Sequence, residues 1–298
     1  MDRIFRKLQK LSESFYVNLP KKWILKFNLD KDSTIAIDIR NDGTLLISPK
    51  LKQNKVDLKD ELILHSSPHV VREIITNCLS GQTNLVVISD KIIPKSLRNE
   101  IRRFVNGLPN TEITEEERQR IVIQNFGYKK IPTKKLIHRL LYLIADMFDN
   151  LKIDAIEDLK YNFGQLRKFY FILVIHIRTY LRTSIYVTED NDFTPLEAMD
   201  YRMFCEKIQA IGKILKDLRL SESESVKGYF HEIHQYFNDV MKAYLRKNIG
   251  LAHETWLRKE AIVTEGKSLM EKSDYEDKDK IKDMIMLAEN CKKLAALI

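Results

Sequence analysis

Lysine and arginine side chains gather at the start of this sequence. Residues 1–50 hold ten cations and six carboxylates, so this sixth of the chain carries half of the net charge of +8. The cations that we assign to DNA binding are Arg3, Arg6, Lys7, Lys10, Lys21, Lys22 and Lys26. Several cations on one surface neutralise phosphates and release counterions, with no particular base sequence required. We predict that they bind the backbone of double-stranded DNA; the alternative is a solvated basic surface without a ligand.

Histidines offer weaker candidates for chemistry. His231 and His234 are three residues apart, which suits two ligands of Zn²⁺, yet no third ligand completes a known motif. We interpret this pair as surface or helix-packing histidines. His176 and His138 have apolar neighbours and are interpreted as hydrogen-bonded core histidines.

Catalytic and nucleotide-binding motifs are missing from the sequence. It contains no GxxxxGK[ST], GxGxxG, HExxH or GxSxG pattern, and its nine glycines offer little material for phosphate-binding loops. We predict no catalytic residue and no cofactor, and therefore a protein that is not an enzyme.

Cysteine usage and hydropathy indicate the compartment. Cys78, Cys205 and Cys291 lie far apart, and an odd number cannot form a complete disulfide framework. The longest apolar run, residues 169–175, is far shorter than the roughly 20 residues that span a bilayer. We expect free thiols in a cytoplasmic protein that is neither secreted nor inserted in a membrane.

Alternating apolar residues predict a β-rich domain over residues 1–52. Residues 4–11 and 14–19 have the period of a strand, and Pro20 then begins a short helix ending at Phe27. Alternation resumes over 35–39 and continues to Ile47 after the turn signal Asn41-Asp42-Gly43. Two hairpins therefore flank one helical turn. A unit of this size has little core of its own, so we expect it to form a homodimer.

Residues 58–130 predict a small α/β layer, and residues 132–298 predict a six-helix bundle made of two three-helix units. The layer has expected strands at 62–65, 83–89 and 119–126 and expected helices at 67–81 and 94–107. The acidic run Glu115-Glu116-Glu117 is interpreted as a solvated turn or helix face. The expected bundle helices are 133–150, 153–184, 195–219, 222–247, 249–273 and 277–298. Their breaks fall at Thr194-Pro195, at Ser221 and at Asn248.

Three stretches together resemble a known family. They are 6–8 and 14–23 with Leu29, Asp32 and Asp42-Gly43; Phe169-Tyr170-Phe171-Ile172-Leu173-Val174; and Asp200-Tyr201-Arg202. The chain resembles the archaeal proteins that fuse a SpoVT-AbrB domain to a PhoU-like helical region through a small α/β segment. The resemblance implies an α+β multidomain protein whose N-terminal swapped hairpins interleave two copies into a barrel-like dimer.

The same resemblance implies DNA binding through basic residues of the first strand and its loops. Arg6 and Lys7 fall on the matching positions. Tyr16 stands where an arginine is common, and the usual arginine pair after the proline is replaced by nearby lysines. The resemblance therefore supports phosphate binding more than base recognition.

PhoU-like bundles are expected to bind metal through carboxylates four residues apart on a helix. The matching positions here are Phe163 with Arg167 and Gln209 with Lys213, none of which is acidic. We predict no metal cluster, and a bundle that senses a signal, oligomerises or binds a partner.

The resulting hypothesis is a transcriptional regulator linked to phosphate uptake. The alternative is a PhoU-like adaptor that acts on a phosphate transporter or signalling protein without binding DNA. Antitoxin and metal-storing roles are less favoured, because the helical region is long and its expected metal positions lack carboxylates.

Overall fold

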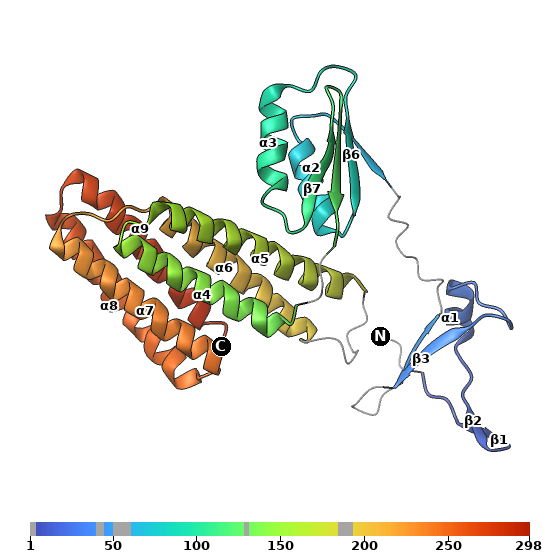
Figure 1. Ribbon diagram of the computed structural model, residues 1–298. Helices are drawn as coiled ribbons and strands as arrows, with labels where there is room; N and C mark the ends of the chain where they lie inside the picture. Colours follow the sequence, from blue (N-terminus) through green and yellow to red (C-terminus); the bar gives the residue numbers. More distant parts are fainter. Residues whose placement is uncertain (1–3, 40–44, 50–60, 128–130, 184–192) are drawn as a thin grey trace. The chain divides into compact units, whose positions relative to one another are not determined.

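Strands come first and helices last in this chain. The computed structural model describes residues 4–39, 45–49, 61–127, 131–183 and 193–298. The chain divides into an N-terminal unit, Met1–Leu58, and a C-terminal unit, Lys59–Ile298. Small sheets and a helical C-terminal region confirm the predicted α+β class (Figure 1). The predicted domain boundary at 52–58 falls outside the described residues.

The N-terminal unit contains two hairpins that flank a short helix. Its elements are β1 (Gln9–Leu11), β2 (Ser14–Tyr16), α1 (Lys21–Lys26), β3 (Ile35–Ile39) and β4 (Leu45–Pro49). β1 pairs antiparallel with β2 and β3 with β4, as predicted. The turn signal at 41–43 lies outside the described residues. The first two strands are shorter than the alternation predicts.

None of the described side chains in the N-terminal unit whose exposure is known is buried. Phe5 is 81% exposed, Leu8 70% and Phe15 66%. Isolated two-stranded hairpins are marginally stable in water, and here each sheet has two strands. One copy of this unit therefore leaves its apolar side chains facing solvent.

The C-terminal unit begins with a four-stranded sheet and two helices. The elements are β5 (Leu62–His65), α2 (Val70–Leu79), β6 (Asn84–Ile88), α3 (Lys95–Val105), β7 (Thr111–Glu116) and β8 (Arg120–Asn125). The strand order is β5-β6-β8-β7, with β5 and β6 parallel and the other pairs antiparallel. In Figure 1, α2 and α3 lie on one side of the sheet. We call this part the α/β layer.

The sequence pattern does not predict strand β7, and the interpretation of Glu115 and Glu116 as a turn or helix face is wrong. Both residues belong to this edge strand, where Glu116 pairs with Arg102 and Glu115 with Arg120. Ile113 is the single large aliphatic side chain in β7, so its sequence lacks the alternation that marks a strand. Hydrogen bonds to β8 determine the conformation.

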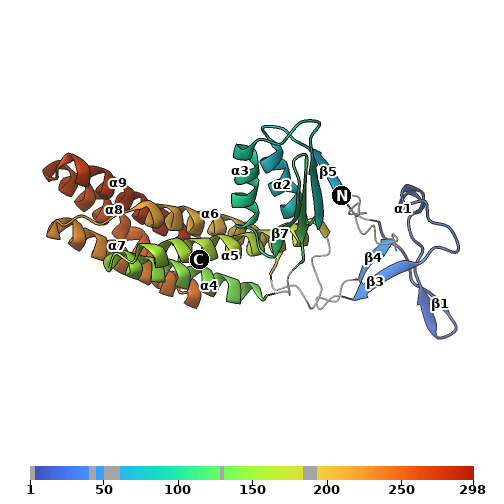
Figure 2. The ribbon, with the colours of Figure 1, turned by 45° about the horizontal axis from the view of Figure 1, so that its top comes forward.

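The helical bundle follows the layer. Its helices are α4 (Thr133–Lys152), α5 (Ile156–Thr183), α6 (Pro195–Asp217), α7 (Glu224–Arg246), α8 (Ile249–Lys272) and α9 (Tyr275–Ala295). These helices confirm the six predicted segments, with ends that differ by a few residues. α5 packs against both α4 and α6, and α7, α8 and α9 pack against one another (Figure 2). Among the described residues, no helix is both long and apolar enough to cross a membrane.

Side-chain caps explain where several bundle helices begin. Thr194 accepts a hydrogen bond from the Glu197 N–H at 3.2 Å, while the Glu197 carboxylate accepts one from the Thr194 N–H at 2.8 Å. This reciprocal arrangement satisfies two backbone donors at the start of α6. Asn248 similarly accepts the Leu251 N–H at 3.0 Å, so α8 begins at the predicted break.

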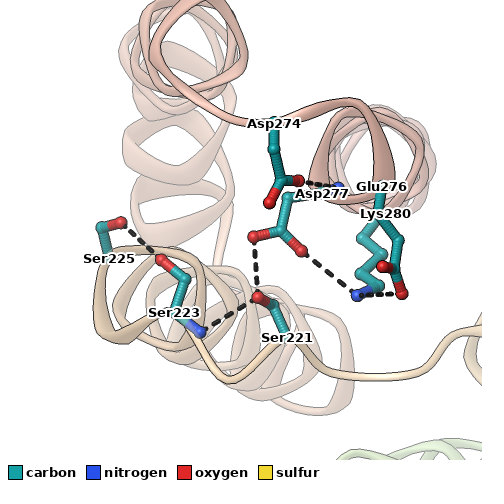
Figure 3. Close-up of polar contacts among 7 residues, drawn as sticks. All are labelled: Ser221, Ser223, Ser225, Asp274, Glu276, Asp277 and Lys280. Atoms are coloured by element: carbon teal, nitrogen blue, oxygen red, sulfur yellow. Dashed lines mark hydrogen bonds and ion pairs between the residues drawn. The ribbon is translucent and has the colours of Figure 1, made fainter.

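A polar cluster ties the loop before α7 to the first turn of α9 (Figure 3). The Ser221 hydroxyl donates to Asp277 Oδ2 at 2.7 Å, and Lys280 donates to Asp277 Oδ1 at 3.1 Å. Ser221 and Asp277 are both more than 90% buried. The Ser221 hydrogen bond lowers the pKa of the Asp277 carboxyl despite its desolvation, and the ammonium group of Lys280 lowers it further.

We expect Ser221→Ala to lower the free energy of unfolding by about 1–2 kcal/mol, because a buried carboxylate oxygen loses its donor. Ser225→Ala is the matched control, since Ser225 is exposed and bonds only the Ser223 hydroxyl within the cluster. Urea unfolding at pH 7 measures both. Equal stability of the two variants would show that the Ser221 contact contributes nothing.

Candidate nucleic-acid interface

The predicted DNA-binding cations lie on the surface of the N-terminal unit. Arg6 and Lys7 precede β1, Lys10 lies in β1, and Lys21, Lys22 and Lys26 belong to α1. All six are exposed. Arg3, the seventh, lies outside the described residues.

Helix α1 and its C-cap carry lysine and aromatic side chains on neighbouring faces. Trp23 and Phe27 are one turn apart, and their ring centroids are 5.5 Å apart. Lys22 and Lys26 have the same spacing, so they share a face next to these rings. The Lys26 ammonium lies 5.7 Å from the centroid of the Phe27 ring. The helix therefore presents two ammonium groups on one exposed face.

No carboxylate among the described residues forms an ion pair with these six cations. In the part of the chain that the structure describes, every ion pair lies between Glu61 and Lys292. Arg6 donates one hydrogen bond, to the carbonyl oxygen of Phe5 at 3.4 Å. A cation without a carboxylate partner can contact a phosphate directly. Each such contact releases counterions that were condensed on the nucleic acid, which favours binding. The basic surface is therefore electrostatically available to a polyanion.

The acidic side chain of Asp30, which precedes β3, is held within its own turn. Asp30 accepts the Ser33 hydroxyl at 2.7 Å and the Asp32 N–H at 3.1 Å. These hydrogen bonds lower the pKa of the Asp30 carboxyl, with the Ser33 hydroxyl the largest cause. The carboxylate thus fixes the turn before β3 instead of pairing with a lysine.

Large apolar side chains accompany the cations, a feature that strand periodicity alone does not reveal. Phe5 and Leu8 flank Arg6 and Lys7, and Leu25 precedes Lys26 at 64% exposure. Contiguous exposed apolar surface in a soluble protein commonly marks an interaction site. A purely solvated basic face would not need these residues.

The histidines of the bundle have separate roles. His234 is 5% exposed and stacks on Phe148 with ring centroids 4.8 Å apart, which confirms it as a packing histidine. His231 is exposed. His138 is also exposed, so its interpretation as a core histidine is wrong: α4 turns Leu136 and Ile137 inward instead.

The positions compared with PhoU metal motifs do not share one environment. Phe163, Arg167 and Gln209 are half-buried, whereas Lys213 is exposed. The ammonium of Lys216 lies 5.2 Å from the Phe163 ring centroid. Across the described ranges, no three His, Cys, Asp or Glu side chains gather into a group able to hold a metal ion.

The three cysteines are free and buried, which confirms the expected thiols. Burial raises the pKa of Cys78 to about 12 and that of Cys205 to about 12. Burial also raises the pKa of Cys291. Because the thiolate is the nucleophile, these groups are chemically inert in the folded protein.

Comparison with known proteins gave no match at any level. No family model matches the chain, and no curated protein or solved structure shows significant similarity to it. The functional assignment therefore rests on the residues and contacts described above.

Proposed function

We propose that this protein is a cytoplasmic, dimeric DNA-binding transcriptional regulator linked to phosphate uptake. In this proposal, the N-terminal unit is a swapped-hairpin domain of the SpoVT-AbrB type, and the PhoU-like bundle senses a signal or oligomerises. The observation that carries the proposal is the group of six exposed cations, none of which has a carboxylate partner among the described residues.

The uncovered apolar surface of the N-terminal unit supports the proposed dimer. Phe5, Leu8 and Phe15 are each at least 66% exposed in one copy. Burial of apolar area contributes about 25 cal/mol per Å², so a second copy that covers these side chains would stabilise both. It would also double the number of cations that meet one DNA duplex.

The test is the affinity for a labelled DNA fragment from the gene's own upstream region, measured at several salt concentrations with excess competitor. Binding through six to ten phosphate contacts should weaken by about 10³–10⁵ between 50 and 200 mM salt. We expect Arg6→Glu/Lys7→Glu to reduce affinity about 100-fold or more at constant salt, because attraction becomes repulsion on both copies.

The matched control is Lys134→Glu/Lys135→Glu on α4, which makes the same change in net charge at two adjacent exposed cations. We expect its affinity to remain within about threefold of the wild type. An equal loss of DNA affinity in both variants would mean that binding depends only on the total charge of the protein. Failure of the wild-type protein to bind at low salt would overturn the proposal.

A row of exposed apolar side chains on α6 favours the adaptor as the second candidate. Leu196 is 70% exposed, Met199 61% and Met203 50%, and their spacing of three and four places them on one face. Methionine-rich surfaces adapt readily to a partner. Under this alternative, the face would bind a phosphate transporter or signalling protein, and wild-type protein would show no DNA binding.

A further inference from the structure

The two edge strands of the α/β layer, β5 and β7, have opposite compositions (Figure 2). β7 carries Glu112, Glu115 and Glu116, and its register with β8 shifts between Ile113 and Glu115. Charged side chains and such irregularities keep a natural edge strand from pairing with another chain. β5 has neither, because three of its four residues are aliphatic and its register with β6 is regular. β5 is therefore the edge that remains open to a further strand.

The outer side of β5 presents backbone groups that no described residue pairs with. The Ser66 N–H donates to the Ile88 carbonyl oxygen at 2.8 Å, so the N–H of Ser66 points toward β6. Successive residues of a strand direct their backbone groups to alternate sides. His65 and Ile63 therefore direct their N–H and C=O groups away from β6. Within the described ranges, β5 pairs with β6 alone.

The Ile63 side chain is also uncovered. Leu64 belongs to the buried cluster that includes Val70 and Ile74 of α2, so its neighbour Ile63 lies on the opposite face of the sheet. Ile63 is 55% exposed. A strand added outside β5 would cover part of this apolar surface and satisfy the outward backbone groups.

A second copy of β5 fits this edge in one antiparallel register. With Ile63 opposite the second copy's Ile63, both residues direct their backbone groups at each other and form a hydrogen-bonded pair. Glu61 then lies opposite the second copy's His65, whose ring N–H can donate to the carboxylate. A shift of two residues in either direction leaves Glu61 or His65 without a counterpart among residues 61–65. Side-chain chemistry and backbone direction thus favour the register centred on Ile63.

We propose that β5 strands of two copies pair antiparallel around Ile63 and join two four-stranded sheets into one continuous sheet. The contact is isologous, because the same strand serves both copies. It is separate from the dimer contact proposed for the N-terminal unit, and it does not depend on DNA binding. If the N-terminal units also dimerise, the covalent link raises the effective concentration of the second contact.

Disulfide cross-linking of the full chain tests the register. Hydrogen-bonded antiparallel pairs have Cα atoms about 5.5 Å apart, within the range of about 4.4–6.8 Å that a disulfide spans. With diamide as the oxidant, Ile63→Cys should give at least about tenfold more cross-linked dimer than Ile92→Cys. Ile92 is the matched control, because it is 59% exposed and lies in the loop after β6. The native cysteines are buried and contribute little background.

A register control uses the same reaction. Because His65 is expected opposite Glu61, the two His65 positions are too far apart for a disulfide. His65→Cys alone should therefore not cross-link above the Ile92→Cys level, whereas a mixture of Glu61→Cys and His65→Cys chains should.

Amide hydrogen exchange of the full chain at high concentration gives a second readout. The His65 N–H should exchange at least about tenfold more slowly in the wild type and in Ile92→Lys than in Ile63→Lys. A lysine at the edge disfavours pairing, and Ile92→Lys makes the same change in charge and polarity. Ile63 is exposed, so neither of its variants should prevent folding.

Each outcome bears on the contact between copies. The proposal is overturned if Ile63→Cys cross-links no more than Ile92→Cys, if His65→Cys alone links as readily, or if Ile63→Lys leaves exchange unchanged. Slow exchange at His65 without cross-linking would mean that another segment of the same chain covers β5, which also overturns it. Loss of DNA binding has no bearing on these results, so the two proposals fail separately.

Discussion

Lowering the pH from 7 to 4.5 should reduce the free energy of unfolding by about 2.5 kcal/mol through His234 alone. This side chain is 5% exposed and stacks parallel on Phe148. Burial lowers the pKa of His234 to about 4, and Lys152 lowers it further. Asp149, 3.9 Å from Nδ1, raises the pKa and offsets only part of this effect. The folded protein therefore holds a neutral imidazole.

The sign of this pH dependence follows from which state, folded or unfolded, protonates His234 first as the pH falls. In the unfolded chain His234 titrates near pH 6.5, whereas in the folded protein it titrates near 4. Between these values the unfolded state binds more protons, so stability falls steadily as the pH falls from about 6.5 to about 4. Below about 4 both states are protonated and the loss is complete. The depressed pKa of Asp277 adds its own loss only below its ordinary value of 3.8.

Urea unfolding of His234→Phe at intervals between pH 7 and 4.5 tests this prediction. Phenylalanine keeps an aromatic ring against Phe148 but cannot titrate, so about 2.5 kcal/mol of the pH dependence should disappear. His231→Gln, one turn away on the exposed face of α7, should leave the pH dependence unchanged. An unaltered slope in the phenylalanine variant would mean that other groups cause the acid sensitivity.

Gly266→Ala should lower the free energy of unfolding by about 2–3 kcal/mol. At this position three helices of the bundle meet, and a Cβ atom would overlap the Tyr229 hydroxyl and lie 2.7 Å from Tyr229 Cζ. On its other side it would lie 2.8 Å from Ile285 Cγ1. Displacing Tyr229 would also break its hydrogen bond to the Ile262 carbonyl, which measures 3.0 Å. These losses exceed the gain in helix propensity from alanine.

Gly228→Ala is the matched control, because nothing lies within 4 Å of its added Cβ atom on the exposed face of α7. It should raise stability by about 1 kcal/mol through helix propensity. Adding Tyr229→Phe to Gly266→Ala should recover part of the loss, since the overlapping hydroxyl is gone. Strict additivity of these two substitutions in urea unfolding would argue against the contact.

Local sequence signals predicted the helices well, for identifiable reasons. Apolar spacing of three and four marks each bundle helix, and caps such as Thr194 and Asn248 mark their starts. The sequence did not predict β7, because an edge strand with one face in water needs few apolar residues. The strands around Phe5 and Leu8 were predicted too long, because alternation does not reveal whether a partner strand exists within one chain.

The sequence located the basic residues of the candidate interface but not the lack of acidic partners, which depends on tertiary contacts. In the sequence, Arg167 is distinctive only as a non-acidic residue at an expected metal position. Its contact with Phe104 joins helices from different parts of the chain, so no local pattern could have predicted it. The environment of Arg167 depends on long-range packing, which periodicity and composition do not encode.

The buried side chains of the α/β layer and the bundle form one continuous cluster, which includes Leu64 in β5 and Leu294 in α9. The contact of Phe104 with Phe171 belongs to their shared boundary. A gene fragment that encodes the bundle without the layer would therefore expose apolar surface that residues 61–298 bury together. Recombination within residues 61–298 should be selected against, so we expect the layer and the bundle to be inherited together.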